Sequence, residues 1–214
     1  MFGVESTQIE AVVLTHEHTD HTRGAKRFCL EHKIPVFATR GTIALTDLDG
    51  VDQIVIKPGK SARIGGLTID PFKVRHLAAE PVALSVSVDS RKLGIASDLG
   101  SVTQEVVKEM SGSDLMMVEA NYDEEMLLNG DYPEFLKRAI RGDHGHLSNN
   151  DAATLSTKAS CDKTRTIVLV HLSKENNTPE KALDTVRDKV RNSKHRPTLE
   201  VTQHGSPGGP YRLN

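Results

Sequence analysis

Three histidines and one aspartate lie within six residues near the start of the chain, in the stretch LTHEHTDH. They are His16, His18, Asp20 and His21, and they follow the apolar run Ile9–Leu14. His16 and His18 are two residues apart at the end of an expected strand, so their side chains can point the same way. Imidazole and carboxylate groups are ligands of catalytic zinc, manganese and iron. The stretch therefore predicts a metal site. Two adjacent ions can share it, since one small ion cannot easily take four ligands from so short a loop.

Further ligand candidates come after later apolar runs. His76 follows PFKV, Asp98 follows KLGIAS and His171 follows TIVLV. Each of them alone could be an ordinary loop residue, but strand ends are where the loops of an α/β fold gather around a site. We predict that His16, His18 and His76 bind one ion, that Asp20, His21 and His171 bind the other, and that Asp98 bridges the two.

The expected chemistry is hydrolysis. Two divalent ions about 3.5–4 Å apart can hold a bridging hydroxide at neutral pH, and this hydroxide is a nucleophile, so no serine or cysteine is required. Asp20 can also orient it. His146, in GDHGHLSNN, precedes an expected helix and is the candidate proton donor to the leaving oxygen. Glu119, in MVEAN, can orient His146. The alternatives are a helix-capping role for His146 and a surface partner for Glu119.

Composition and charge narrow the class of protein. The 214 residues are 37% hydrophobic and 26% charged, which is typical of one globular domain spanning 1–214. The formal net charge of −2 argues against a broad basic face, so any contact with nucleic acid has to be local. Candidate cations are Arg23, Lys26, Arg27, Lys137, Arg138 and Arg141, although a solvated helix face would explain them too. With three Tyr, five Phe and no Trp, no base-stacking platform is evident.

The chain shows no sign of a membrane or secretory protein. No window approaches 18 apolar residues, and the N-terminus lacks the layout of a signal peptide. Two cysteines far apart, Cys29 and Cys161, fit a reducing compartment better than a disulfide framework. We therefore expect a cytoplasmic protein without a membrane partner.

Apolar runs and helical patterns alternate along the chain, which predicts an α/β layered fold. The expected strands are Ile9–Leu14, Pro35–Ala38, Ile54–Ile56, Leu67–Val74, Ala83–Asp89, Lys92–Ala96, Leu115–Ala120, Ile167–Val170 and Leu199–Thr202. The expected helices are Arg23–Lys33, Val102–Ser111, Pro133–Arg141, Asn149–Ser160 and Thr178–Arg191, with Asn149 or Asn150 and Thr178 as caps of the last two.

The ordered metal motifs resemble those of the metallo-β-lactamase superfamily. The stretches THEHTDH, SDLG, VEANYDEEMLLNGDYP, GHLSNNDAA and VHLSKENNTPEKA resemble, more narrowly, the YycJ/WalJ-type hydrolases, from about residue 9 to 202. The resemblance implies an αββα sandwich, two divalent ions (Zn or Mn), and a cytoplasmic phosphodiesterase with DNA exonuclease activity, hence DNA as the substrate. In related tRNA 3′-processing nucleases, a Glu and a His placed like Glu119 and His146 form a pair.

The chain departs from the family pattern in three places. Only fifteen residues precede His16, so the first half-sheet is expected to be incomplete. Leu77 follows His76 where the family has an aspartate, and Tyr122 stands where the family has a histidine. Two alternatives stay open on these grounds. One is a hydrolase of a small phosphodiester or a thioester at the same site, and the other is an inactive, truncated homologue.

Overall fold

The computed structural model describes residues 5–191, 193–206 and 208–213. The chain divides into two compact units. Unit 1 comprises the described residues up to Lys73 together with Leu77–Val88, and unit 2 comprises Val74–His76 and the described residues from Asp89 onward. The candidate site residues are therefore divided between the two units.

Unit 1 contains a small parallel sheet and an antiparallel meander. The parallel sheet has the order β1-β2-β3, and β4, β5 and β6 pair antiparallel in sequence order. The strands are β1 (Val12–Val13), β2 (Val36–Ala38), β3 (Gln53–Val55), β4 (Ala62–Ile64), β5 (Leu67–Lys73) and β6 (Val82–Val88). A 3₁₀ turn (Ser6–Gln8) and the helices α1 (Thr19–Thr22), α2 (Ala25–His32) and α3 (Arg40–Ala44) connect or precede them.

The core of unit 1 fixes both ends of the histidine-rich stretch. Leu14, directly before it, is buried, and so are Ala25 and Cys29 on α2, directly after it. Ala25 and Cys29 are four residues apart, so they lie on one face of the helix and pack in the same cluster as Val36 of β2. Residues 15–24 are thereby held as a short bridge between a strand and a helix.

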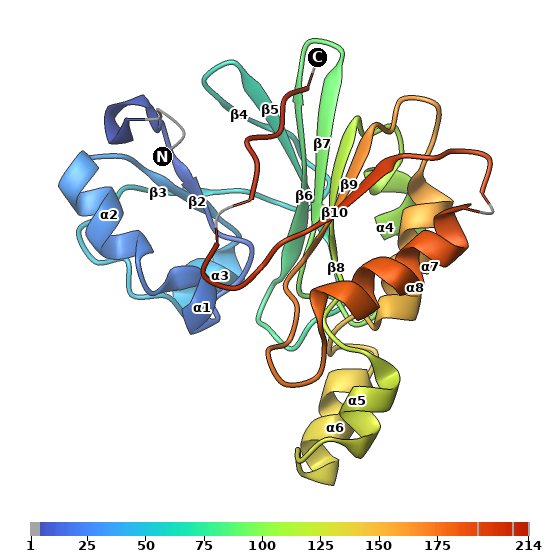
Figure 1. Cartoon of the computed structure of the whole chain (residues 1–214). Helices are drawn as coiled ribbons and strands as arrows, with labels where there is room; N and C mark the ends of the chain where they lie inside the picture. Colours follow the sequence, from blue (N-terminus) through green and yellow to red (C-terminus); the bar gives the residue numbers. More distant parts are fainter. Residues whose placement is uncertain (1–4, 192, 207, 214) are drawn as a thin grey trace. The chain divides into compact units, whose positions relative to one another are not determined.

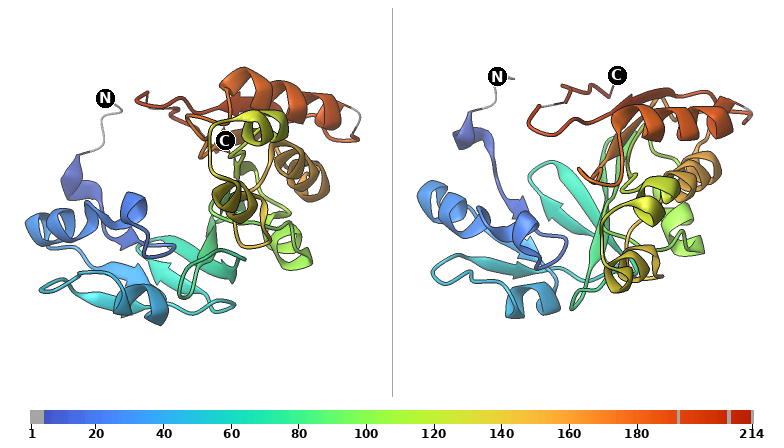
Figure 2. Two further views of the ribbon diagram at one scale, coloured as in Figure 1. Left: turned by 90° about the horizontal axis from the view of Figure 1, so that it is seen from below. Right: turned by 60° about the horizontal axis from the view of Figure 1, so that its bottom comes forward.

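Unit 2 is built on a parallel sheet with the order β10-β9-β8-β7. Its strands are β7 (Arg91–Ala96), β8 (Leu115–Glu119), β9 (Thr166–Val170) and β10 (Thr198–Val201). The helices α4 (Gln104–Met110), α7 (Asn149–Ala159) and α8 (Pro179–Arg191) pack on one face of it (Figures 1 and 2). The middle of β8 and of β9 is an almost uninterrupted apolar run, as expected for strands at the centre of a parallel sheet.

Two further helices, α5 (Glu124–Asn129) and α6 (Glu134–Arg141), form a pair beyond the sheet of unit 2 (Figure 1). The Asp123 side chain accepts a hydrogen bond from the Met126 N–H and so caps α5. The buried side chain of Lys137, on α6, donates to the Leu128 carbonyl on α5 at 2.8 Å. This bond ties the two short helices together.

The predicted strands and helices are all present, with bounds that differ by three residues or fewer. The sequence reasoning missed β4, α1, α3 and α5, which are three to six residues long and too short to show a period. The predicted cap of α7 is wrong. Ser148, and neither Asn149 nor Asn150, caps this helix, because its hydroxyl accepts from the Asp151 N–H while the Asp151 carboxylate accepts from Ser148.

Candidate active site

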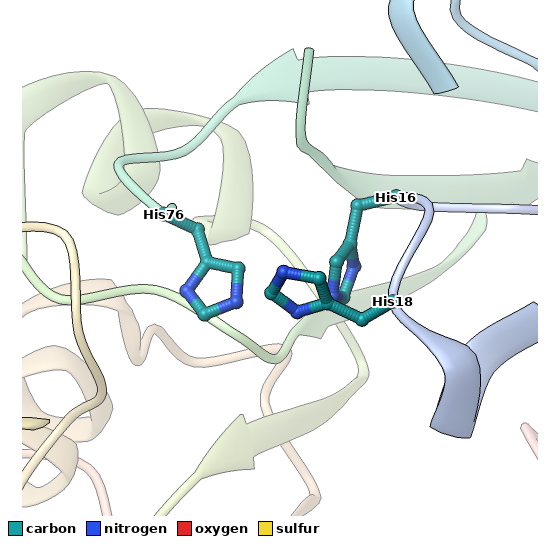
Figure 3. A group of neighbouring side chains, drawn as sticks. All are labelled: His16, His18 and His76. Atoms are coloured by element: carbon teal, nitrogen blue, oxygen red, sulfur yellow. The ribbon is translucent and has the colours of Figure 1, made fainter. Parts of the chain in front are cut away.

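In unit 1, the histidine-rich stretch brings its imidazoles together. The ring centroids of His16 and His18 are 4.5 Å apart, and those of His16 and His21 are 4.3 Å apart. Asp20 and His21 lie on the single turn of α1, with Asp20 Oδ2 3.4 Å from His21 Nε2. The rings of His16 and His18 lie close together in Figure 3, which also draws His76. His16 is buried, whereas Asp20 is exposed and can reach an ion from the solvent side.

Hydrogen bonds at one ring nitrogen select the other as the candidate ligand atom. His18 Nε2 lies 3.0 Å from the Leu77 carbonyl, to which it can only donate, so Nδ1 is the candidate ligand atom of His18. His16 Nδ1 is 3.1 Å from the Thr15 hydroxyl, which points to Nε2 for His16. Leu77, where the family has an aspartate, thus contributes its backbone carbonyl while its side chain is exposed.

In unit 2, the fully buried carboxylate of Glu119 holds two histidines. Its Oε1 accepts from His146 Nδ1 at 2.7 Å and from His171 Nδ1 at 2.8 Å. Its Oε2 accepts from the backbone N–H groups of Leu99 and Leu147, at 3.0 and 3.3 Å. Burial alone would raise the pKa of Glu119, but the hydrogen bonds from the two histidines outweigh it and hold this pKa below its ordinary value.

With four donors, the Glu119 carboxylate is an orienting group and not a metal ligand. It fixes the Nδ1–H tautomer of both imidazoles, so Nε2 is the ring nitrogen that each presents to other groups. His171 can then bind an ion through Nε2, with Glu119 as the hydrogen-bonded carboxylate behind it. His146 can present Nε2 to a substrate in the same way.

His76 and Asp98 lie beside this pair of histidines. His76 Nδ1 donates to the Gly145 carbonyl at 3.0 Å, so its Nε2, which is 3.9 Å from Asp98 Oδ1, is the candidate ligand atom. Asp98 Oδ2 accepts from the Ser97 hydroxyl at 2.7 Å. Its Oδ1 lies 3.6 Å from His171 Nδ1 and 3.9 Å from His146 Nδ1. Asp98 thus directs one carboxylate oxygen toward three histidines.

The backbone is strained at two of the predicted ligands. Asp98 and His171 both have φ of +58°, in the left-handed region that residues other than glycine rarely adopt. Asp98 lies two residues after β7, and His171 directly after β9. Such strain persists only where the surrounding structure imposes it, and it concentrates at functional sites. The strain therefore supports Asp98 and His171 as residues of the site, on grounds that do not depend on their residue types.

Three asparagines position the site, and sequence reasoning gave two of them, Asn121 and Asn177, no role. Asn121 Nδ2 donates to the His171 carbonyl at 3.0 Å. The Asn149 and Asn177 side chains bond each other reciprocally, at 3.0 and 2.8 Å, and Asn177 also donates to the Ala120 carbonyl. The stretches VEANY, GHLSNN and HLSKENN, which are distant in sequence, therefore meet around the end of β8. The unusual density of Asn in these stretches was the available signal.

Two of the cation expectations need correction. Lys137 is buried and bonded to the Leu128 carbonyl, so it cannot reach a substrate. Lys26 Nζ lies 2.6 Å from Asp47, which neutralises much of its charge locally. Arg138 and Arg141 are exposed, as a role in binding a phosphate backbone requires.

The donor set suits divalent metal. In unit 2, Asp98 Oδ1 lies within 3.9 Å of a ring nitrogen of His76, His146 and His171, and unit 1 adds three histidines and a carboxylate in one short stretch. All donors are imidazole nitrogen or carboxylate oxygen, which zinc and manganese both accept.

None of the helices formed by the described residues is long and apolar enough to cross a membrane.

The sequence profile of a family described as "Beta-lactamase superfamily domain" matches residues 3–172. The metallo-β-lactamase fold protein YhfI of Bacillus subtilis has a similar structure, with a TM-score of 0.73 at 17% identity, covering 95% of this chain and 79% of that one. The chain therefore belongs to the metallo-β-lactamase superfamily, and its fold is the mixed α/β fold of that superfamily.

Nearer relatives define the group within the superfamily. The chain is 35% identical over 179 residues to exodeoxyribonuclease YycJ of Bacillus anthracis, covering 81% of this chain and 68% of the relative. It is 32% identical over 181 residues to exodeoxyribonuclease WalJ of Streptococcus pneumoniae, covering 81% and 67%. The resemblance to the YycJ/WalJ-type hydrolases is thus confirmed, and with it the expectation of a hydrolase that depends on divalent metal ions.

Proposed function

We propose that the chain is a dinuclear-metal phosphodiesterase that acts on DNA as an exonuclease. The ligands of the two ions are those predicted from the sequence, with Asp98 shared. In this proposal, as the order of the sequence motifs suggests, His16, His18 and His76 bind the first ion. Asp20, His21 and His171 bind the second.

The observation that carries the proposal is the buried Glu119 carboxylate between His146 and His171. One carboxylate orients an imidazole that can bind metal and a second that can act on the substrate, at 2.8 and 2.7 Å. A hydrolysis that needs a metal-activated nucleophile and a separate proton donor uses such a pair. The names of the relatives, both exodeoxyribonucleases, support DNA as the substrate.

When bound, a pair of divalent ions generates a nucleophile from water at neutral pH and neutralises charge on a phosphate group. The side chains of the protein supply the rest. In the doubly protonated imidazole of His146, the Glu119 carboxylate accepts the Nδ1–H and the Nε2–H is left to face the substrate. His146 then gives the Nε2 proton to the leaving oxygen. Asp20, the exposed carboxylate of the histidine-rich stretch, orients the attacking oxygen.

Two alternatives make different predictions about substrates. A hydrolase of a small phosphodiester or a thioester would use the same ligands, and an inactive homologue would bind metal or a partner without turnover. The exposed Arg138 and Arg141 on the helix before His146 favour a polyanionic substrate over a thioester. The cytoplasmic location stays a prediction that rests on the two thiols.

Four measurements on one preparation separate these possibilities. They are metal content after purification without chelator, hydrolysis of bis-p-nitrophenyl phosphate, hydrolysis of a glutathione thioester, and degradation of single-stranded DNA labelled at either end. We expect about two ions per chain, phosphodiesterase activity, and stepwise loss of nucleotides from one DNA end. Thioesterase activity alone would support the thioester hydrolase, and bound metal without any hydrolysis would support the inactive homologue.

The metal is expected to be zinc after purification, because zinc binds nitrogen and oxygen sites more tightly than manganese. Manganese can still give higher turnover, since affinity and activity are separate properties of a site. Reconstitution of the metal-free protein with each ion, followed by the phosphodiester assay, decides between them.

A further inference from the structure

One exposed surface of unit 2, on helix α6, includes an aromatic ring to which the proposed function gives no role. Phe135 has 71% of its surface exposed, the largest fraction among the exposed large hydrophobic residues described. Arg138 and Arg141 follow it at intervals of three and are exposed as well. Residues three apart lie on the same side of a helix, so the three form one stripe, here called the Phe135 stripe. The exposed Ala139 lies one turn from Phe135, and the exposed Glu134 lies one turn from Arg138.

The acidic residues next to the stripe already have partners. The Glu134 carboxylate lies 3.4 Å from Lys137 Nζ, and that of Asp143 lies 3.6 Å from Arg75. Arg138 Nε makes a long bond to the Glu134 carbonyl at 3.3 Å, which uses one donor of its guanidinium and leaves others directed to solvent. The stripe therefore presents two guanidinium groups and one aromatic ring, with the neighbouring negative charge locally balanced.

The stripe is held rigidly and leads to His146. Lys137 of α6 is buried and bonded to the Leu128 carbonyl, which fixes α6 against α5. At the other end, the His146 N–H donates to the Ile140 carbonyl at 2.9 Å and the Gly145 N–H to the Gly142 carbonyl at 2.8 Å. From Phe135 to Arg141 the helix rises about 9 Å. A chain of phosphates lying along α6 would thus be directed toward the proposed proton donor.

We infer that the Phe135 stripe binds the single strand of the DNA substrate, with a base stacked on Phe135 and backbone phosphates at Arg138 and Arg141. Aromatic rings combined with cations are the usual means of binding single-stranded nucleic acid without sequence preference. This inference rests on the proposed function and adds to it the surface that selects a strand over a small phosphodiester.

The test compares Phe135→Ala and the double variant Arg138→Ala/Arg141→Ala with two matched controls. Leu128→Ala removes another exposed apolar side chain, 48% exposed on α5, and Arg187→Ala removes an exposed arginine that pairs with Asp184 on α8. Binding of a fluorescein-labelled phosphorothioate 12-mer of deoxythymidine to the metal-loaded protein is measured by fluorescence anisotropy. Hydrolysis of bis-p-nitrophenyl phosphate, too small to reach the stripe, reports on the metal centre.

We expect each stripe variant to bind the 12-mer at least fivefold more weakly, the low end of what the loss of one stacked base costs. The double variant should also lower the slope of log K against log salt by about 1.4, since each phosphate contact on a single strand contributes about 0.7. Phe135→Ala should leave that slope unchanged, and Phe135→Tyr should restore binding. All variants should hydrolyse the small substrate at the parent rate.

Three results would overturn the inference. The first is binding of the 12-mer within twofold of the parent by both stripe variants, and the second is an equal loss in the two controls. The third is a change from dimer to monomer in Phe135→Ala on gel filtration with light scattering, which would make the stripe an interface between copies. A parent protein that hydrolyses the small ester but neither binds nor degrades DNA would refute the proposed function itself.

Discussion

Replacing Glu119 by glutamine changes one oxygen for an amide nitrogen and removes a buried charge without changing the shape of the side chain. The carboxylate accepts four hydrogen bonds, two on each oxygen. An amide has one accepting oxygen and one donating nitrogen. Whichever way the amide is turned, its NH₂ group faces two N–H donors, either the imidazoles of His146 and His171 or the backbone of Leu99 and Leu147. Two of the four bonds are therefore lost in either orientation.

The expected loss of folding stability can be worked out from the two lost hydrogen bonds. A hydrogen bond to a charged group contributes about 1.5–3 kcal/mol, so losing two of them costs at least about 3 kcal/mol. The lower end is the better figure, because a neutral amide costs less to bury than a carboxylate. In a chain of this length, about 3 kcal/mol lowers Tm by roughly 6–12 °C. Metal affinity should fall about 10–100-fold, since the group behind a ligating histidine is lost.

Asp114→Asn is the matched control, because Asp114 directly precedes the strand that Glu119 ends. Asp114 is also a buried carboxylate, with Oδ1 3.2 Å from Arg91 Nη1 and Oδ2 accepting from the Lys92 N–H at 2.9 Å. It lies outside the candidate site. Calorimetry of the metal-free proteins gives Tm, titration with Zn²⁺ gives metal affinity, and degradation of end-labelled DNA, whose leaving oxygen needs a proton, gives kcat.

We expect both variants to lose stability, but only Glu119→Gln to lose metal affinity and turnover. The loss in kcat should reach the 10²–10⁴-fold that a positioned acid contributes, because His146 is no longer held. The reasoning would be refuted by a Glu119→Gln protein with lower Tm but with metal affinity and kcat within twofold of the parent. In that case Glu119 would stabilise the fold, and neither histidine would depend on it.

The remaining predictions use the same assays. His146→Ala should cut the turnover of substrates with poor leaving groups about 10²–10⁴-fold and leave the metal content unchanged. A p-nitrophenolate leaving group should largely hide this loss. Loss of metal instead would make His146 a ligand. Asp20→Ala should abolish turnover and empty the second metal position more than the first, so activity within a few-fold of the parent would contradict its role. Gly145→Ala should lower Tm, because its Cβ would meet the Ile140 carbonyl, and equal Tm values would be inconsistent with that contact. Burial would raise the pKa of Asp114, but the bonds from Lys92 and Arg91 hold it below the ordinary 3.8. The ionised Asp114 carboxylate therefore stabilises the fold fully at pH values well above its ordinary pKa. This stabilisation is lost as the pH falls through the lower pKa that Asp114 has in the folded state. The stability advantage of the parent over Asp114→Asn should therefore shrink in acid.

Much of the fold was predictable because parallel strands and amphipathic helices leave clear patterns. The run TIVLV and the period of Thr178–Arg191 specify β9 and α8 within one residue. The proximity of several candidate ligands was predictable for a related reason. The carboxyl ends of parallel strands lie at one edge of a sheet, so polar residues directly after such strands come close together. Glu119 and His146 lie within hydrogen-bond distance, as the family resemblance implied.

What could not be predicted depends on contacts between distant segments. No periodicity shows that Lys137 turns inward to the Leu128 carbonyl while Arg138, its neighbour, faces solvent. That Glu119 holds His171 as well as His146 depends on the register of β8 against β9, in which Glu119 pairs with Val170. The composition also could not predict the exposed ring of Phe135, because a count of five phenylalanines does not show which of them is exposed.

The segment from Phe135 to Ser148 brings the substrate-related features into one continuous run. It begins with the Phe135 stripe, turns at Gly145, whose carbonyl holds His76, presents His146, and ends at the cap of α7. The candidate metal ligands lie elsewhere, at strand ends and in the histidine-rich stretch. In the proposed function these ligands would define hydrolysis, whereas this run would define which ester is bound and how its leaving group departs. Substrate preference in this protein should therefore change through substitutions in residues 135–148 that leave metal content untouched.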